Sequence, residues 1–166
     1  MKLKSLGIIA AAGLAALTLT ACGAAPGTGS AASKGTEIGK TFKLGYDLEL
    51  SGAVAAYGNA GKNGANLAVD EINKSGGING KQITVVSKDN KSDNAEAATV
   101  VSNLINNDKV NAVIGSMTSG AVKSMTPNIP KGAVPLVTPA GTDDTLTVTN
   151  GKVNDYIFRS TFQDSY

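Results

Sequence analysis

Two loop segments carry residues whose types and spacing favour binding of a small molecule. Ser119 follows Gly115 and a short polar stretch, at the point where a helical pattern begins. A hydroxyl at a helix start accepts from free backbone amides, and those amides, with the helix dipole, attract an anion such as a carboxylate. Helix capping alone would account for Ser119 equally well, so this residue by itself leaves both interpretations open.

The second segment runs from Thr138 to Thr142 and combines rigidity with hydrogen-bonding groups. Pro139 restricts the backbone and Gly141 permits close approach, while Thr142 presents a hydroxyl. With the carbonyl of Ala140, this would place an acceptor for an ammonium beside a donor for a carboxylate. Read alone, such a segment is more often an ordinary turn between a strand and a helix.

Tyr57 lies in a third loop, residues 50–58, which again follows a strand pattern. Its ring could cover an apolar ligand, although burial against the following helix is an equally good interpretation. The three loops together therefore offer hydroxyls, a carbonyl and an aromatic ring.

Residues for catalysis and metal binding are scarce. The chain has no histidine, the commonest general base and metal ligand, and its single cysteine is Cys22. The glycines of residues 58–64 match neither the dinucleotide fingerprint nor the phosphate loop. The adjacent side chains of Asp143 and Asp144 rarely converge on one point and are expected in a solvated loop. We therefore expect no enzyme, no cofactor and no metal site.

Alternating strand and helix patterns must position these loops. They predict an α/β fold, an open doubly wound parallel sheet with helices on both faces. In such a sheet the ligand lies beyond the carboxyl ends of the strands, where all three loops fall. The predicted strands are residues 41–48, 82–88, 111–114 and 134–137, and the predicted helices are residues 60–74, 94–107 and 120–129.

Two local signals refine the helices. Asp93 followed by Glu96 predicts a capping box at the start of the second helix. The first helix has small and apolar residues at helical spacing, which we expect to share one buried face: Gly64, Ala65, Ala68, Val69 and Ile72.

The first residues predict export. Lys2 and Lys4 precede an apolar segment, Leu6 to Leu19, which is too short for a permanent membrane span. The sequence Leu19-Thr20-Ala21-Cys22 resembles the lipobox of bacterial lipoproteins, whose cysteine receives a diacylglyceryl group before cleavage on its N-terminal side. We therefore predict a signal peptide at residues 1–21 and an extracytoplasmic protein, lipid-anchored at Cys22 to the bacterial cell membrane. A secreted protein with a spare thiol is the less favoured alternative.

Composition separates a tether from a domain. Residues 22–40 are rich in Gly, Ala, Ser and Thr, so we expect a flexible tether, and residues 41–166 are enough for one domain. The net charge of +2 disappears once Lys2 and Lys4 are removed. The mature chain therefore has no basic field for nucleic acid.

A series of motifs runs through residues 41–166: Leu50-Ser51-Gly52 with Tyr57-Gly58, Gly61 to Gly64, Ala68 to Asn73, Gly76 to Gly80, Asp89-Asn90, Val113-Ile114-Gly115, and Pro135 to Pro139. In order and spacing they resemble the N-terminal lobe of leucine/isoleucine/valine-binding proteins, type 1 periplasmic binding proteins that feed ABC importers. The resemblance implies a two-lobed protein with ligand between the lobes, of which residues 41–166 are an incomplete first lobe and the second is absent. The end of the chain, Arg159 to Tyr166, resembles the first crossover between lobes.

The resemblance also implies roles for single residues. In that family a serine at the start of the third helix and a threonine after the fourth strand bind the ligand's carboxylate and ammonium, aided by a backbone carbonyl. The matching positions are Ser119, Thr142 and Ala140, and Tyr57 falls where an aromatic residue lines the aliphatic pocket.

The function that the resemblance implies is the substrate-binding component of an ABC importer for amino acids, branched-chain or other small aliphatic ones. Its partners would be the ligand, the permease subunits and, through the lipid anchor, the membrane. A ligand-sensing ectodomain for amino acids or amides on the same fold is the alternative.

Overall fold

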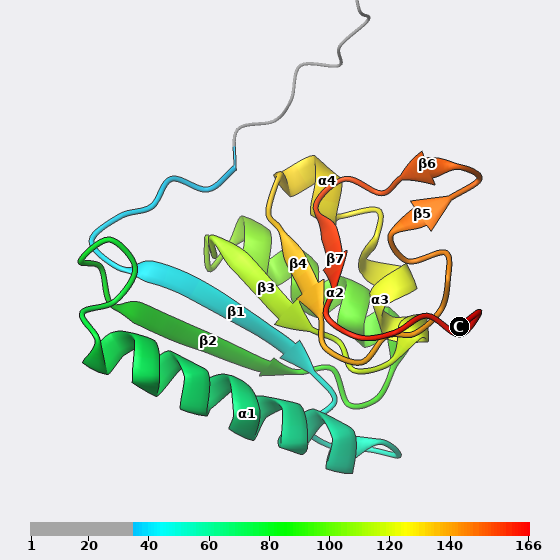
Figure 1. Cartoon of the computed structure of the whole chain (residues 1–166), viewed down its shortest axis with the longest axis horizontal. Helices are drawn as coiled ribbons and strands as arrows, with labels where there is room; N and C mark the ends of the chain where they lie inside the picture. The colour runs from blue at the N-terminus through cyan, green and yellow to red at the C-terminus, as the bar shows by residue number, and fades with distance from the viewer. Residues whose placement is uncertain (1–34) are drawn as a thin grey trace, which may run out of the picture. The chain divides into compact units, whose positions relative to one another are not determined.

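The computed structural model describes residues 35–166, so the predicted signal peptide, Cys22 and most of the predicted tether lie outside the described residues. In this part of the chain no helix is both long and apolar enough to cross a membrane. The elements, in chain order (Figure 1), are β1 (Phe42–Leu48), α1 (Ala55–Lys74), β2 (Ile83–Asp89), α2 (Asn94–Asn106), β3 (Ala112–Gly115), α3 (Ser119–Met125), α4 (Ile129–Gly132), β4 (Leu136–Thr138), β5 (Val148–Thr149), β6 (Lys152–Val153) and β7 (Ile157–Arg159).

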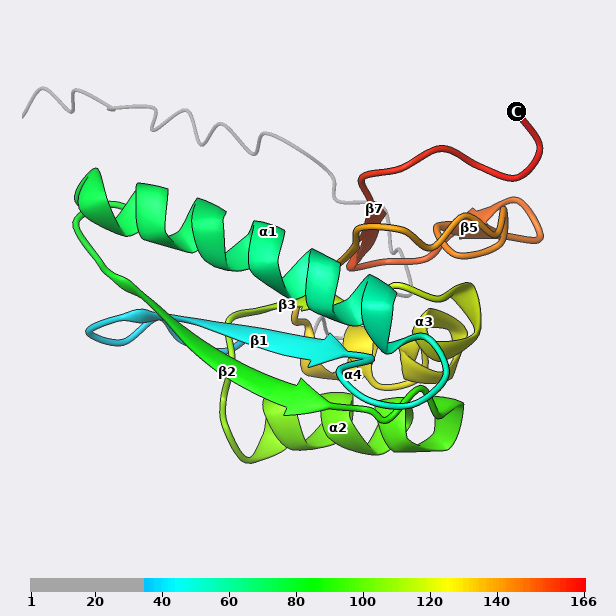
Figure 2. The same cartoon turned by 90° about the horizontal axis from the view of Figure 1, so that it is seen from below.

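Within residues 35–166, five strands form a parallel sheet in the order β2-β1-β3-β4-β7. Figure 2 shows α1 on one face of this sheet and α2 on the other, the side on which α3 and α4 also pack. The order follows from right-handed crossovers, each of which carries a helix over one sheet face. The predicted open, doubly wound parallel sheet is confirmed.

Most predicted element boundaries are confirmed to within two residues, namely those of β1, β2, α2, β3 and β4. The capping box predicted at the start of α2 is half confirmed: the side chain of Asp93 accepts a hydrogen bond from the amide of Glu96 at 2.7 Å. The amide of Asp93 donates to the carbonyl of Asn90 instead of to Glu96, whose carboxylate accepts from Lys91.

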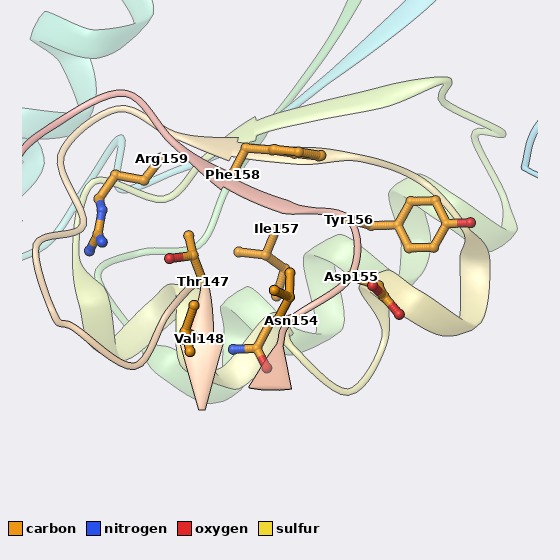
Figure 3. A pocket seen from close by; sticks show the side chains of 9 residues that line it. Thr147, Val148, Asn154, Asp155, Tyr156, Ile157, Phe158 and Arg159 are labelled. Atoms are coloured by element: carbon orange, nitrogen blue, oxygen red, sulfur yellow. The ribbon is translucent and has the colours of Figure 1, made fainter. Parts of the chain in front are cut away.

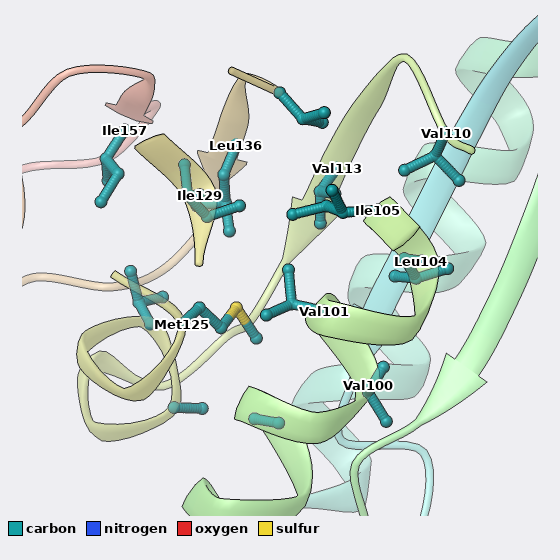
Figure 4. Packing of buried hydrophobic residues seen from close by; sticks show 14 of the residues in the cluster. Val100, Val101, Leu104, Ile105, Val110, Val113, Met125, Ile129, Leu136 and Ile157 are labelled. Carbon is teal, nitrogen blue, oxygen red and sulfur yellow. The ribbon is translucent and has the colours of Figure 1, made fainter. Parts of the chain in front are cut away.

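The larger core lies between the sheet and the helices α2, α3 and α4 (Figure 4). Helix α2 packs closely on β1, since a Cβ at Gly45 would lie 3.2 Å from a methyl carbon of Leu104. Full burial of a valine, leucine, isoleucine or methionine side chain stabilises the fold by roughly 1.5–3 kcal/mol relative to leaving it exposed. Fully buried members include Val101, Leu104, Val113, Met125, Ile129 and Leu136.

A smaller core lies between α1 and the strands β1 and β2. Here the predicted buried face of α1 is only partly right: Val69 is buried and Ala65 half-buried, whereas the other three residues are exposed. Those three are Gly64, Ala68 and Ile72. The helix also begins at Ala55 rather than at residue 60. Among the described residues, α1 is the one helix on this face of the sheet. No other described helix packs against its flanks, so only the side of α1 that meets β1 and β2 is buried.

Burial on this face of the sheet falls with distance from α1. Tyr46, Ile114, Val137 and Phe158 lie side by side in register across four strands. Tyr46 beneath the helix is 0% exposed, whereas Val137 is 37% and Phe158 54% exposed. Within residues 35–166, the apolar face beyond α1 is therefore uncovered.

The single helix predicted at residues 120–129 is wrong. The structure has two short helices, and the second begins at Ile129 with Pro130 next to it. Proline lacks an amide hydrogen and its ring would clash with the carbonyl four residues earlier, so one continuous helix cannot pass through this point.

The short strands after β4 were not predicted. β5 and β6 form an antiparallel hairpin, and β7 adds to the sheet beside β4. Each has only two or three residues, too few for a periodic pattern to be visible in the sequence.

Candidate ligand-binding site

The candidate site lies at the carboxyl edge of the sheet, because parallel strands bring their carboxyl ends together. The segments after β1, β2, β3 and β4 all begin at this edge. Three of them carry the residues selected from the sequence: Tyr57 follows β1, Ser119 follows β3, and Ala140 and Thr142 follow β4.

Ser119 is the first residue of α3, and its hydroxyl points to the loop after β4. It accepts hydrogen bonds from the amides of Thr142 at 3.1 Å and Asp143 at 3.2 Å. The N-cap residue of α3 is Thr118. The hydroxyl of Ser119 is therefore joined to the neighbouring loop, and its own proton stays available for a further acceptor.

The backbone around Thr142 is fixed from a second side by Arg159, which the sequence analysis did not select. Its Nη1 donates to the carbonyls of Thr142 at 3.2 Å and Asp143 at 2.9 Å. Among residues 35–166, no hydrogen bond is made by the side-chain hydroxyl of Thr142 or by the carbonyl of Ala140. The loop therefore presents two groups on a fixed backbone. The hydroxyl of Thr142 can donate or accept a hydrogen bond, and the carbonyl of Ala140 can accept one.

Tyr57 lies in the first turn of α1 at the same edge, and its side chain is 64% exposed. No hydrogen bond within residues 35–166 joins it to Ser119, Ala140 or Thr142. The early turns of α1 do approach the loop after β3, because a Cβ at Gly61 would lie 2.7 Å from the sulfur of Met117. The structure therefore brings Ser119 next to the loop that contains Ala140 and Thr142, and it leaves Tyr57 exposed to solvent at the same edge.

Glu49 is a buried carboxylate that the sequence analysis missed. Its two carboxylate oxygens accept from the amide of Met117 at 3.0 Å, the amide of Thr118 at 3.2 Å and the hydroxyl of Thr118 at 2.8 Å. Glu49 therefore occupies the amides of Met117 and Thr118, which lie just before α3. The sequence analysis had expected free amides at this helix start to attract the anionic group of a ligand. An acidic residue directly after an apolar strand was the available signal.

Asp47 is a second buried acid near the edge. Burial raises its pKa to about 8, the amide of Asn90 opposes this by donating at 3.0 Å, and the charges of Glu49 and Glu96 raise it further. The other carboxylate oxygen, Oδ2, has no partner among the described residues. Asp47 therefore favours its protonated form at neutral pH.

Asp143 is not simply a solvated loop acid. Its Oδ2 accepts from Lys123 of α3 at 2.6 Å, and its Oδ1 accepts from the hydroxyl of Thr145 at 2.6 Å. These hydrogen bonds hold the pKa of Asp143 well below its usual value. Asp143 therefore remains ionised beside the candidate site.

Asp89 ties the loop after β2 to the loop after β1. Its carboxylate accepts from the hydroxyl of Ser51 at 2.6 Å and from the amides of Leu50, Ser51 and Lys91. Partial burial would raise its pKa, but these hydrogen bonds lower it below the usual value. The Leu50-Ser51-Gly52 and Asp89-Asn90 motifs are thus one hydrogen-bonded unit.

A pocket lies beside the candidate site and not within it. It is lined by Thr147, Val148 and residues 153–159, from the β5–β6 hairpin and β7 (Figure 3). None of Tyr57, Ser119, Ala140 and Thr142 lines it, and Arg159 is its link to the Thr142 loop. Because none of the residues selected from the sequence lines it, we define the candidate site by the hydroxyls of Ser119 and Thr142 and the carbonyl of Ala140.

Comparison with known proteins gives these features a context. The family model described as periplasmic binding protein matches residues 41–166. The Leu/Ile/Val-binding protein of Escherichia coli is 33% identical over 128 residues, which are 77% of this chain and 34% of that protein. The Leu/Ile/Val-binding protein BraC3 of Rhizobium johnstonii is 36% identical over 104 residues, 63% of this chain and 28% of that protein.

Solved structures agree with the sequence comparisons. The branched-chain amino acid transporter substrate binding protein LivJ from Streptococcus pneumoniae, in complex with isoleucine, is 55% identical with a TM-score of 0.72, over 76% of this chain and 35% of that one. The leucine binding protein LivK from Thermotoga maritima is 27% identical with a TM-score of 0.66, over 75% of this chain and 33% of that one. The chain thus spans about a third of the length of these relatives.

Proposed function

Because this chain belongs to the periplasmic binding protein family, we propose that it is the extracytoplasmic substrate-binding component of an ABC importer for amino acids, branched-chain or other small aliphatic ones. The observation that carries the proposal is the joining of Ser119 to the Thr142 loop, which gathers unused hydrogen-bonding groups at the carboxyl edge. The names of its relatives, which include leucine and Leu/Ile/Val-binding proteins, favour the same ligand class.

The proposed ligand is a zwitterion with an aliphatic side chain. The hydroxyls of Ser119 and Thr142 bind its α-carboxylate and α-ammonium, and the carbonyl of Ala140 accepts from the ammonium. Hydrogen bonds to charged groups contribute roughly 1.5–3 kcal/mol each, so this set is enough to orient the ligand. Tyr57 covers the aliphatic side chain with its exposed ring.

The protein acts, in this proposal, by binding and delivery and not by catalysis. Residues 41–166 form the first lobe of a two-lobed binding unit, and closure of the second lobe over the ligand presents the closed form to the permease subunits. Residues 1–21 direct export, Cys22 carries the lipid that holds the protein at the membrane, and residues 22–40 are the tether.

The test is calorimetric titration of the full-length protein with L-leucine, L-isoleucine and L-valine. Two analogues make it specific: 3-methylbutylamine resembles leucine without the carboxylate, and 4-methylpentanoate resembles it without the ammonium. We expect at least one of the three amino acids to bind and both analogues to bind at least about 100-fold more weakly, because each lacks one set of charge-assisted hydrogen bonds. Absence of binding by any aliphatic amino acid, or equal binding of an analogue, would contradict the proposal.

A further inference from the structure

A row of fully buried polar side chains follows the carboxyl ends of four neighbouring strands. Asn90 follows β2, Asp47 lies in β1, Ser116 follows β3 and Thr138 ends β4, which is the spatial order of these strands in the sheet. All four residues are 0% exposed. A buried polar group costs free energy unless it is hydrogen-bonded, so the partners of these side chains decide what the row does.

The side chains are joined to one another. The amide of Asn90 donates to Asp47 Oδ1 at 3.0 Å and to the hydroxyl of Ser116 at 2.9 Å. That hydroxyl donates to the carbonyl of Asp47 at 2.9 Å. These three bonds fix the segment after β3 against β1 and the loop after β2.

Thr138 extends the row into the proposed binding loop. Its hydroxyl donates to the carbonyl of Ser116 at 2.7 Å and accepts from the amide of Gly141 at 2.9 Å. A Cβ at Gly141 would lie 2.8 Å from this hydroxyl oxygen, so the close approach depends on glycine. Gly141 stands between Ala140 and Thr142, whose carbonyl and hydroxyl are proposed to meet the ligand.

The hydroxyl of Thr138 therefore holds both segments of the candidate site, the one that leads to Ser119 and the one that leads to Thr142. Ser116 lies just before Ser119 in the chain, and Gly141 lies just before Thr142. If Thr138 loses its hydroxyl, the carbonyl of Ser116 and the amide of Gly141 each lose a buried partner. Such unsatisfied groups move toward water, and both loops move with them.

We propose that the row Asn90–Ser116–Thr138, anchored on Asp47, positions the Ser119 and Thr142 loops for ligand, with Thr138 as the positioning residue that links them. The side chains of the row are buried and do not touch the ligand. This inference rests on the proposed function for its effect on affinity, whereas its effect on loop order is independent of any ligand.

The experiment compares Thr138→Val, which keeps the shape without the hydroxyl, with Thr138→Ser, which keeps the hydroxyl. Val113→Ala is the matched control, because it removes buried apolar volume from the second residue of β3, which has no hydrogen bond to the side chains of the row. In the full-length protein we would measure amide hydrogen exchange of residues 139–145, thermal unfolding, and L-isoleucine affinity by calorimetry. Ser116→Ala, which breaks the row one link earlier, replaces Thr138→Val if that variant does not fold.

We expect Thr138→Val to speed exchange in residues 139–145 beyond any change in Val113→Ala, and to weaken isoleucine binding on the order of tenfold. Thr138→Ser should restore both values. The inference is overturned if Thr138→Val leaves the exchange of this loop equal to that of the control, or if Thr138→Ser is as impaired as Thr138→Val. If the wild-type protein binds no isoleucine, the proposed function fails for that ligand, and loop exchange alone still decides the positioning role.

Discussion

The amide of Thr142 donates a hydrogen bond to the hydroxyl of Ser119 at 3.1 Å, across 23 positions of the sequence. This contact joins the start of α3 to the loop after β4. It brings two separate sequence motifs together at one edge of the sheet, and the replacement of Ser119 and of Thr142 should therefore have different effects.

Replacement of Thr142 by valine should reduce affinity with little effect on stability. The side-chain hydroxyl of Thr142 has no partner within residues 35–166, while its backbone is held by Ser119 and Arg159. Loss of one hydrogen bond to a charged ligand group costs about 1.5–3 kcal/mol, or on the order of 10-fold to 150-fold in Kd. Calorimetry on Thr142→Val and Thr142→Ser checks this, and wild-type affinity in Thr142→Val would remove the residue from the site.

Replacement of Ser119 by alanine should reduce both affinity and stability. The amides of Thr142 and Asp143 would lose their acceptor, so we expect the unfolding free energy to fall by about 1 kcal/mol in addition to the loss of ligand binding. Thermal melts with and without ligand measure the two effects separately. A stability loss with unchanged affinity would show that Ser119 only holds the loop.

Asp47 should make stability depend on pH in the neutral range. Its pKa rises from 3.8 to about 8 on folding, so between these values the folded state keeps a proton that the unfolded chain has released. The unfolding free energy should therefore fall as pH rises through this window, by up to about 1.4 kcal/mol per unit. Urea unfolding of wild type and Asp47→Asn from pH 4 to 9 tests the sign.

The matched control is Asp143→Asn. The pKa of Asp143 is lowered, so its contribution lies in the acid range, present above its unfolded pKa and lost as pH falls. The slope between pH 5 and 8 should disappear in Asp47→Asn and persist in Asp143→Asn. A wild-type slope that survives Asp47→Asn would have another source.

Two leucines, one on α2 and one on α1, allow the buried and the exposed helix surfaces to be compared. Leu104 of α2 is 0% exposed in the larger core, whereas Leu67 of α1 is 61% exposed. Leu104→Ala should destabilise the fold by about 2–5 kcal/mol, through lost burial and the cavity left behind. Leu67→Ala should stay within about 0.5 kcal/mol of wild type in residues 35–166. If in the full-length protein it costs as much as Leu104→Ala, other parts of the protein cover this helix.

Cys22 should carry the lipid anchor. In a native-like bacterial host the protein should fractionate with membranes and incorporate labelled palmitate, because two or more acyl chains hold a protein durably at a bilayer. Cys22→Ala should abolish both properties without altering ligand affinity. Equal palmitate labelling of wild type and Cys22→Ala would refute anchoring at this residue.

The sequence by itself determined the order of elements and the edge at which the site forms. Alternating strand and helix patterns require parallel strands, and parallel strands place the segments around Ser119 and Thr142 at one edge whatever the details of packing. The structure confirms this for β1 to β4. It corrects the helix predicted at residues 120–129, where a second helix begins at Ile129 just before Pro130, and the buried face of α1, where Gly64, Ala68 and Ile72 are exposed.

Only the tertiary structure decided which polar groups meet. Periodicity reports which side of an element is apolar, but it does not report which buried polar atom on one strand lies within hydrogen-bonding distance of another. The roles of Thr138 and Arg159 could not be predicted from the sequence, because they depend on contacts with Ser116, 22 positions away, and with Thr142, 17 positions away. Glu49 offered only the signal of an acid directly after a strand, and its contact with Thr118 spans 69 positions. The hydroxyls proposed to face the ligand could be selected from their positions in the sequence, and the network that holds them follows from the packing of strands β2, β1, β3 and β4 side by side.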